Sequence, residues 1–162
     1  MKRHPNKFCP RCGERLSETF DKRKSCSAID CDFVVYDNPI PVIAVIVERE
    51  DGVIFAHNRA WPSGMLGPIT GFVDSGESPL QAAVRELHEE LGLHADKPVL
   101  IGAYGFPVAN QLIIAYHAQV QGTVTLGDEL DAYKVIPVGK LKGWDFGTGL
   151  AVRDWLQSRK IS

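Results

Sequence analysis

The glutamates Glu86, Glu89 and Glu90 have the clearest capacity for chemistry in this sequence. If residues 79–91 form a helix, the three side chains share one face, because residues three and four apart are neighbours on a helix. Carboxylates that share a face repel each other and destabilise the helix unless a cation lies among them. Their hard oxygen ligands favour Mg²⁺ or Mn²⁺ over zinc. From the helix alone, a divalent metal site and an acidic, solvated face are equally good interpretations.

A second chemical feature is the set of four cysteines, which all lie within the first 31 residues. They form a C-x2-C pair, a 13-residue gap and a C-x4-C pair: Cys9, Cys12, Cys26 and Cys31. Two close pairs of thiolates supply the four ligands of a tetrahedral zinc site, whereas two disulfides or unrelated thiols are the alternatives. No apolar stretch follows the basic N-terminal residues, so we expect no secretory signal and a reducing, cytoplasmic location. We therefore predict structural zinc.

The elements that must position these residues follow an α/β pattern. Ser78 and Pro79 are typical of a helix start, and Gly92 of a helix end. Leu80, Val84, Leu87 and Leu91 form the apolar stripe that we expect to bury this helix. Strands are predicted at 41–47, 53–56, 99–104, 111–120 and 135–138, a loop at 61–71, and a final helix from its cap at Thr148 to about Lys160. The turn at 37–39 predicts a boundary between a zinc ribbon, 1–36, and a second domain, 37–162.

Composition limits the class of protein. The chain of 162 residues is 44% hydrophobic and 23% charged, which allows a real core and excludes a disordered tail. A formal net charge of -2 excludes a polycation that grips nucleic acid by charge alone. No apolar run approaches the ~20 residues that span a bilayer, so no membrane association is expected. We interpret the basic run at 22–24 as a solvated turn, with a nucleic-acid contact as the less favoured alternative.

The segment from Gly71 to Leu93 matches the pattern G-x5-E-x7-R-E-U-x-E-E-x-G-U, where U is aliphatic, at every defined position. Gly71 opens it, Glu77 follows, and the helix supplies the rest. This segment resembles the Nudix box, the signature of the Nudix hydrolases. The resemblance implies an α/β/α sandwich around a mixed sheet, preceded here by a small zinc ribbon. It also implies Mg²⁺- or Mn²⁺-dependent hydrolysis of a nucleoside diphosphate linked to another moiety, the activity of a pyrophosphatase.

The resemblance assigns roles to the box residues. Glu86 and Glu90 are similar to the metal ligands of the family, and Glu89 to a further ligand or a water-orienting base. Arg85 is similar to the residue that orients a box carboxylate, and Glu77 to its partner in that network. These roles agree with the chemistry, because a bound cation lowers the pKa of water and neutralises the diphosphate.

Other candidates lie outside the helix. The family often binds metal through the backbone carbonyl at the position of Thr70, and Gly71 beside it is a candidate for substrate binding. A later carboxylate is common too: Asp128 is our choice and Glu129 its rival, and Asp131 matches the second position of an E-x-x-E pair. An acidic turn without a catalytic role is the alternative to these. Phe106 or Tyr104 is expected to stack on a base, with core packing as an equal alternative.

A four-cysteine ribbon before a Nudix domain resembles the NADH pyrophosphatase group and related enzymes of FAD and ADP-ribose. We therefore expect a small nucleotide substrate such as NADH, FAD or ADP-ribose. Two alternatives stay open: hydrolysis of RNA ends such as dinucleotide caps, and a non-catalytic nucleotide sensor or adaptor. Nucleic acid is a possible but not a favoured partner, and the ribbon is also a candidate surface for a homodimer.

Overall fold

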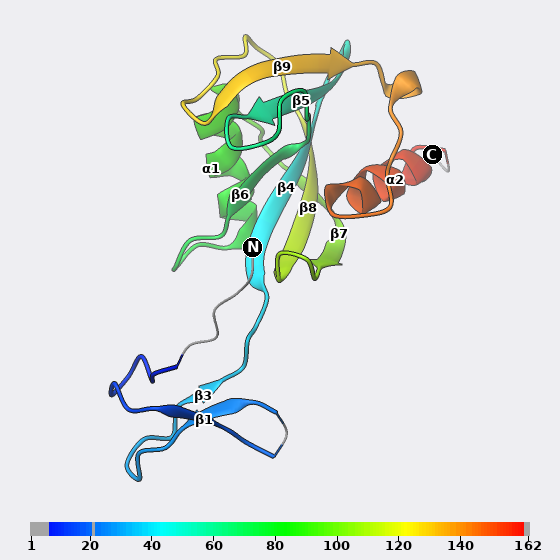
Figure 1. The fold of residues 1–162 in the computed structure, drawn as a ribbon. Coiled ribbons are helices and arrows are strands. Elements are labelled where there is room, and N and C mark those ends of the chain that lie inside the picture. The colour runs from blue at the N-terminus through cyan, green and yellow to red at the C-terminus, as the bar shows by residue number, and fades with distance from the viewer. Residues whose placement is uncertain (1–6, 21, 161–162) are drawn as a thin grey trace. The chain divides into compact units, whose positions relative to one another are not determined.

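The computed structural model describes residues 7–20 and 22–160. The chain divides into two compact units, Met1–Asn38 and Pro39–Ser162, and Figure 1 labels most of their elements. No helix among the described residues has the length and apolar character needed to cross a bilayer.

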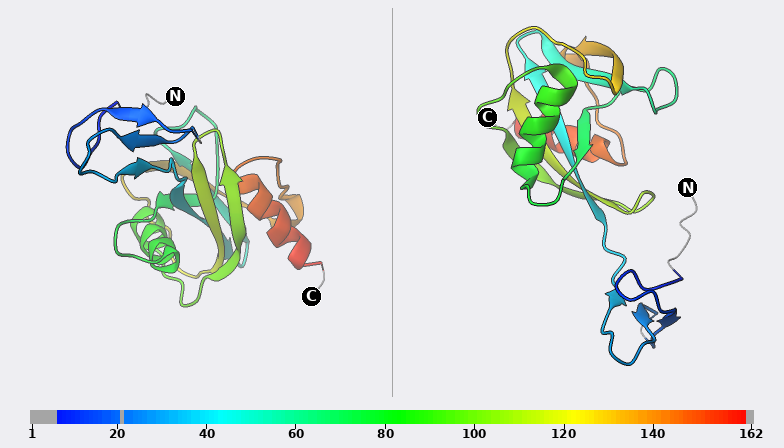
Figure 2. Two further views of the ribbon diagram at one scale, coloured as in Figure 1. Left: turned by 90° about the horizontal axis from the view of Figure 1, so that it is seen from below. Right: turned by 90° about the vertical axis from the view of Figure 1, so that its left-hand side faces the viewer.

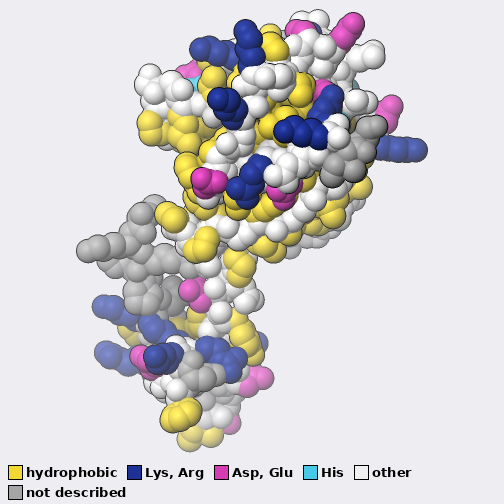
Figure 3. Space-filling model, turned by 90° about the vertical axis from the view of Figure 1, so that its right-hand side faces the viewer, with side chains coloured by type: hydrophobic (Ala, Val, Ile, Leu, Met, Phe, Trp, Pro, Cys, Tyr) yellow, Lys and Arg dark blue, Asp and Glu magenta, His cyan; other side chains and the backbone are white. Residues whose placement is uncertain are grey.

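The first unit is built on a small antiparallel sheet. Its strands are β1 (Leu16–Glu18), β2 (Lys24–Cys26) and β3 (Val34–Val35), in that order across the sheet. Lys and Arg side chains are prominent on its surface in Figure 3. In the basic run, Lys22 is exposed and the guanidinium of Arg23 lies 5.4 Å from the ring centroid of Tyr36. Lys22 and Arg23 therefore belong to the turn between β1 and β2, as the sequence indicated, whereas Lys24 is the first residue of β2.

The second unit contains a mixed sheet of six strands. They are β4 (Ile40–Arg49), β5 (Gly52–Asn58), β6 (Ile69–Phe72), β7 (Val99–Phe106), β8 (Gln111–Gln119) and β9 (Leu130–Ile136). The order is β7-β8-β4-β5-β9, and β6 pairs with the first half of β4. Only the β4–β8 pairing is parallel among the described strands, and its nine-residue register runs from Ile40↔Gln111 to Glu48↔Gln119.

Alternation along β4 directs its side chains to two separate cores, because successive residues of a strand point to opposite faces. Ile43 and Val45 pack with residues of α1 (Pro79–Leu91), such as Leu87. Ile46 packs with Val152 and Trp155 of α2 (Thr148–Ser158). One helix therefore covers each face, which gives the α/β/α sandwich that the sequence predicted (Figures 1 and 2).

The start and end of α1 agree with their sequence signals. The Ser78 hydroxyl accepts a hydrogen bond from the backbone N–H of Gln81, and the Gln81 side-chain oxygen accepts one from the backbone N–H of Ser78. Gly92 adopts a left-handed φ of 65° at the other end. The buried face is rotated from the expected stripe, since Leu80 is 43% exposed while Ala82 and Ala83 are buried.

Three other expectations were wrong in detail. Residues 69–71 belong to β6 and not to a loop, because they pair with β4. The last strand, β9, begins at Leu130, five residues before the expected start. Thr148 is the first residue of α2 and not its cap, since Gly147 holds the cap position without a side-chain hydrogen bond.

Candidate active site

Arg85 organises the carboxylates at the surface of α1. Its guanidinium donates to both carboxylate oxygens of Glu77, at 3.2 and 2.7 Å. It also donates to Glu86 at 2.7 Å and to Glu89 at 3.0 Å. A further N–H reaches the backbone carbonyl of Phe72 in β6, at 3.0 Å. A planar group with five donors suits this arrangement, which fixes three acidic side chains against one strand.

Glu77 differs from the other carboxylates in its electrostatics. The hydrogen bonds from Arg85, and then the backbone N–H of Asp74, hold the pKa of Glu77 below its ordinary value. The Asp74 contact, 2.8 Å long, also closes the loop that leads into α1. Glu77 therefore acts as the fixed anionic partner of Arg85.

Glu90 and Glu86 lie in the opposite electrostatic situation. Glu90 is 5% exposed, and burial, followed by repulsion from Glu86, Glu129 and Glu89, raises its pKa to about 8. Burial also raises the pKa of Glu86, although Arg85 opposes this effect. Buried carboxylates that repel each other are costly for a fold unless a cation neutralises them. A divalent cation held by oxygen ligands would neutralise these buried carboxylates and remove that cost.

Gly71 provides the space for one of these carboxylates. A Cβ atom at Gly71 would lie 2.0 Å from the carboxylate carbon and from one carboxylate oxygen of Glu86. Any side chain at this position would displace Glu86. The first glycine of the box is therefore explained by the close approach of α1 to β6.

A later loop adds a carboxylate to the group. Gly127 fits beneath the backbone carbonyl of Glu89, since a Cβ there would lie 2.3 Å from that oxygen. The next residues bring Glu129 close enough to raise the pKa of both Glu86 and Glu90 by charge repulsion. The side-chain amide of Asn58 donates to Glu129 at 3.3 Å. Of the two rivals in the sequence, Glu129 is thus the one that the structure brings to the box.

A cavity of about 780 Å³ opens above these carboxylates. Thr70, Gly71, Glu86 and Glu129 line it, whereas Asp128 is not among its lining residues. Five aromatic residues line it too: Phe72 at the end of β6, Phe106 at the end of β7, and the loop residues Trp61, Trp144 and Phe146. A pocket lined by both carboxylates and aromatic rings matches a molecule with a metal-bound phosphate group and a flat ring.

The indole rings of Trp61 and Trp144 each pack closely against a glycine. A Cβ at Gly67 would lie 3.0 Å from the ring of Trp61, and one at Gly149 would lie 2.3 Å from the ring of Trp144. Neither tryptophan was predicted for the site. The Gly- and Pro-rich loop around Trp61 was the one available signal, because such loops carry binding residues in many proteins.

The two aromatic residues that the sequence offered for base stacking, Phe106 and Tyr104, have different surroundings in the structure. Phe106 lines the cavity, whereas Tyr104 does not appear in its lining. The hydroxyl group of Tyr104 donates to Asp154 of α2 at 2.8 Å. Burial, followed by the Asp154 contact, raises the pKa of Tyr104 to about 12. Tyr104 thus packs against α2 and the core, which was the alternative to base stacking.

The four cysteines meet in the first unit. Their sulfur atoms all lie within 4.8 Å of one another, with 3.8 Å between Cys9 and Cys31 and 3.4 Å between Cys12 and Cys26. Tetrahedral zinc with bonds of about 2.3 Å places its sulfurs roughly 3.8 Å apart. The four thiols are free of disulfides. The cluster therefore fits one zinc ion.

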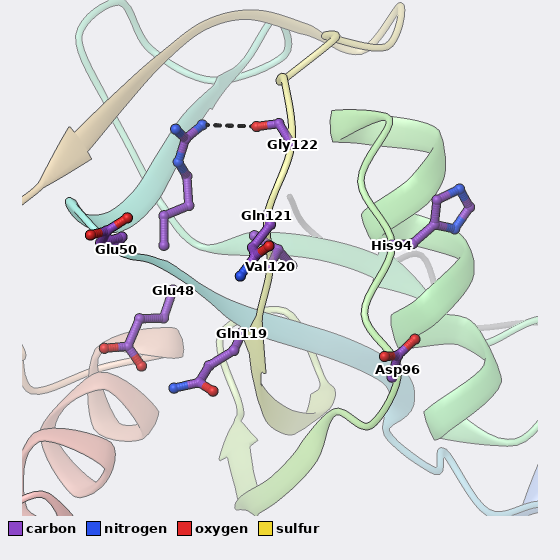
Figure 4. Close-up of a pocket in the computed structure, with 9 residues that line it drawn as sticks. Glu48, Glu50, His94, Asp96, Gln119, Val120, Gln121 and Gly122 are labelled. Carbon is purple, nitrogen blue, oxygen red and sulfur yellow. Dashed lines mark hydrogen bonds between the residues drawn. The ribbon is translucent and has the colours of Figure 1, made fainter.

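A second hollow, of about 960 Å³, lies at the far end of β4 (Figure 4). Its wall holds Glu48, Glu50, His94 and Asp96 but none of the box carboxylates. Glu48 already accepts hydrogen bonds from His117 at 2.7 Å and from Arg159 at 2.8 and 2.9 Å. This hollow is thus a polar surface, and its buried carboxylate, Glu48, is already paired with side chains of the same unit.

Comparison with known proteins agrees with this geometry. Residues 38–155 match the NUDIX domain family. An NAD-capped RNA hydrolase, NudC, from Pseudomonas aeruginosa is 32% identical over 114 residues, which cover 70% of this chain and 41% of the relative. The NudC of Pseudomonas putida F1 is 26% identical over 149 residues, or 90% and 53%. The chain thus spans about half the length, or less, of these relatives.

The fold has solved counterparts as well. A crystal structure of a NUDIX hydrolase from Nitrosomonas europaea superposes with a TM-score of 0.78 at 22% identity. The match covers 97% of this chain and 94% of the other. At this identity the similarity concerns the fold, and it extends over both units of the chain.

Proposed function

Because the chain belongs to the NUDIX hydrolase family, we propose that it is a metal-dependent pyrophosphohydrolase of a nucleoside diphosphate linked to another moiety. NADH, FAD and ADP-ribose are the proposed substrates. The observation that supports this most directly is the cavity whose lining includes both Glu86 and Glu129 and five aromatic rings. Such a cavity suits a substrate with a diphosphate at one end and a base at the other.

In this proposal Glu86, Glu90 and Glu129 hold Mg²⁺ or Mn²⁺, with the backbone carbonyl of Thr70 as a further ligand. Glu129 is thus proposed in place of Asp128, which was the residue expected from the sequence. When bound, the metal lowers the pKa of a water molecule and neutralises the diphosphate. The high pKa of Glu90 supports this assignment, since a buried cation would return that carboxylate to its ionised form.

The other box residues position the reacting groups. Arg85 keeps Glu86 and Glu89 in fixed rotamers, and Glu77 in turn fixes Arg85. Glu89 is 57% exposed, so it has access to water and to a proton released during attack on phosphorus. We assign it to the orientation of that water. Gly71 lines the cavity beside Glu86, where the substrate phosphate binds in this proposal, and Phe106 contacts the base.

A second candidate substrate is the NAD-capped end of an RNA. The names of the curated relatives favour it, since these proteins are NAD-capped RNA hydrolases. The same carboxylates would act on the same diphosphate bond. For the cysteine cluster we propose structural zinc, and for the whole chain a homodimer, which light scattering would test.

The decisive experiment is a hydrolysis panel with the full, zinc-loaded chain. NADH, FAD, ADP-ribose, 8-oxo-dGTP and an NAD-capped RNA are incubated with Mg²⁺ or Mn²⁺. Wild type is compared with Glu90→Gln and with Glu50→Gln, a matched change in the other hollow. We expect cleavage of a dinucleotide or capped RNA, lowered by at least about 10²–10³-fold in Glu90→Gln only. Cleavage of none of the five by a folded, metal-loaded chain would overturn the proposal.

A further inference from the structure

The loop between β5 and β6, residues 59–68, carries part of the aromatic wall. Trp61 and Met65 of this loop line the cavity. At its far end, Gly67 exchanges two backbone hydrogen bonds with Ala56, at 2.9 and 3.0 Å. Near its start, the N–H of Trp61 donates to the carbonyl of Asn58 at 2.9 Å. Between these two points, a side chain of β5 attaches the middle of the loop.

His57 provides that attachment. Its Nε2 lies 3.2 Å from the carbonyl oxygen of Pro62, and its Nδ1 lies 2.6 Å from a carboxylate oxygen of Asp131. The same Pro62 carbonyl accepts from the N–H of Met65 at 3.1 Å. His57 therefore bridges the loop to β9, on the strand pair where the register shifts between His57 and Asn58.

Both partners of His57 are acceptors. A backbone carbonyl has no proton to donate, and an ionised carboxylate has none either. The two contacts are both hydrogen bonds only when Nδ1 and Nε2 each carry a proton, which is the imidazolium form. The contact with Asp131, and then that with Pro62, raises the pKa of His57 against the opposing effect of burial. Among the described contacts of His57, Asp131 of β9 is the charged one, and the loop contributes a neutral carbonyl.

The same region holds the later carboxylate. The backbone N–H of Arg59 donates to the carbonyl of Glu129 at 2.9 Å, next to the contact between Asn58 and the Glu129 side chain. Three successive residues, His57, Asn58 and Arg59, thus contact Glu129 or Asp131 at the start of β9. Asp131, which the sequence offered as a partner for the metal site, is used by His57 instead.

We propose that His57 is a positioning residue whose protonated form holds the β5–β6 loop, and with it Trp61 and Met65, in the wall that receives the base. Loss of a proton removes one of its two hydrogen bonds and loosens the loop. Affinity for the base therefore falls as pH rises, while the box carboxylates stay where they are. This inference rests on the proposed function, because it assigns the aromatic wall to a base.

The test measures AMP binding to the full chain by tryptophan fluorescence, without Mg²⁺, between pH 6 and 9. Two of the three tryptophans line the cavity, so ring binding changes the signal. Ribose 5-phosphate carries the same titrating phosphate but no base, and serves as the control ligand. We expect the Kd for AMP to rise roughly tenfold across the titration of His57, in proportion to one lost charged hydrogen bond. The Kd for ribose 5-phosphate should not show this step.

The variant Asp131→Asn separates positioning from a purely structural role. Its amide oxygen still accepts from Nδ1, but the charge that raises the pKa of His57 is gone. The step in AMP affinity should therefore move to lower pH, whereas His94→Gln, a histidine outside the cavity, should leave it unchanged. Superimposable profiles for wild type and Asp131→Asn, or no response to AMP at any pH, would overturn the inference. If the chain cleaves ADP-ribose but binds AMP equally well at every pH, the role of His57 is refuted and the proposed function stands. If Asp131→Asn moves the pH step in AMP affinity but the chain hydrolyses no substrate, the proposed function is refuted and the role of His57 stands.

Discussion

Removal of the charge at Glu90 should stabilise the metal-free protein. The pKa of Glu90 is raised from an ordinary value of 4.5 to about 8, first by burial and then by the neighbouring carboxylates. In the unfolded chain this group ionises freely above 4.5, so the folded state loses stability as pH rises from there toward 8. At pH 7 the difference corresponds to about 3 kcal/mol. Glu90→Gln keeps the shape and removes this cost, which for a unit of this size raises Tm by about 6–12 °C.

The assay is thermal unfolding of the zinc-loaded chain followed by tryptophan fluorescence. Trp61, Trp144 and Trp155 all belong to the second unit, so the signal reports that unit by itself. Wild type, Glu90→Gln and the control Glu50→Gln are compared at several pH values, in Mg²⁺-free buffer and again with Mg²⁺. Added Mg²⁺ should stabilise wild type and the control but not Glu90→Gln. A Tm for metal-free Glu90→Gln at or below that of wild type at pH 7 would refute the reasoning.

Three further outcomes are expected. Gly71→Ala should lower kcat in steady-state assays by about 10²-fold, because its Cβ would overlap the carboxylate of Glu86. Gly105→Ala is the control and should stay active, since its new Cβ would have no atom within 4 Å beyond its chain neighbours. Arg85→Lys should lower the urea midpoint of unfolding at neutral pH. Wild type gains stability from the lowered pKa of Glu77, and this stability is lost as pH falls through that pKa. The difference in urea midpoint between wild type and Arg85→Lys should therefore shrink in acid. Cys12→Ser should reduce the zinc content, measured by atomic emission, from about one ion per chain to well below it.

The box could be predicted because its information is local. The helix that carries Glu86 and Glu90 has a capping box at its start and a left-handed glycine at its end, and both signals lie within a few residues of the features they specify. Which face of this helix is buried was harder to predict. Leu80 is exposed because the buried face includes Glu90, and a pattern of apolar residues does not predict a buried acid.

The later carboxylate and the aromatic wall depend on contacts between distant segments. Asp128 and Glu129 are adjacent acids, and the choice between them follows from Gly127 beneath α1 and the pairing of Arg59 with Glu129. Trp61 and Trp144 reach one cavity from loops more than 80 residues apart. No spacing rule connects such positions, and composition marked only the segment that begins at Trp61 as a loop.

The parallel pairing of β4 with β8 has a consequence for biosynthesis. The register pairs Ile40 with Gln111 and Glu48 with Gln119. During synthesis, β4 therefore cannot complete its pairing with β8 until residue 119 has left the ribosome. During that interval the apolar run from Val42 to Val47 lacks a full set of neighbours. Such exposed strands favour aggregation and chaperone binding. The cysteine cluster, complete by residue 31, can bind a metal ion much earlier. The two units of this chain therefore mature in sequence, the metal centre first and the hydrolase last.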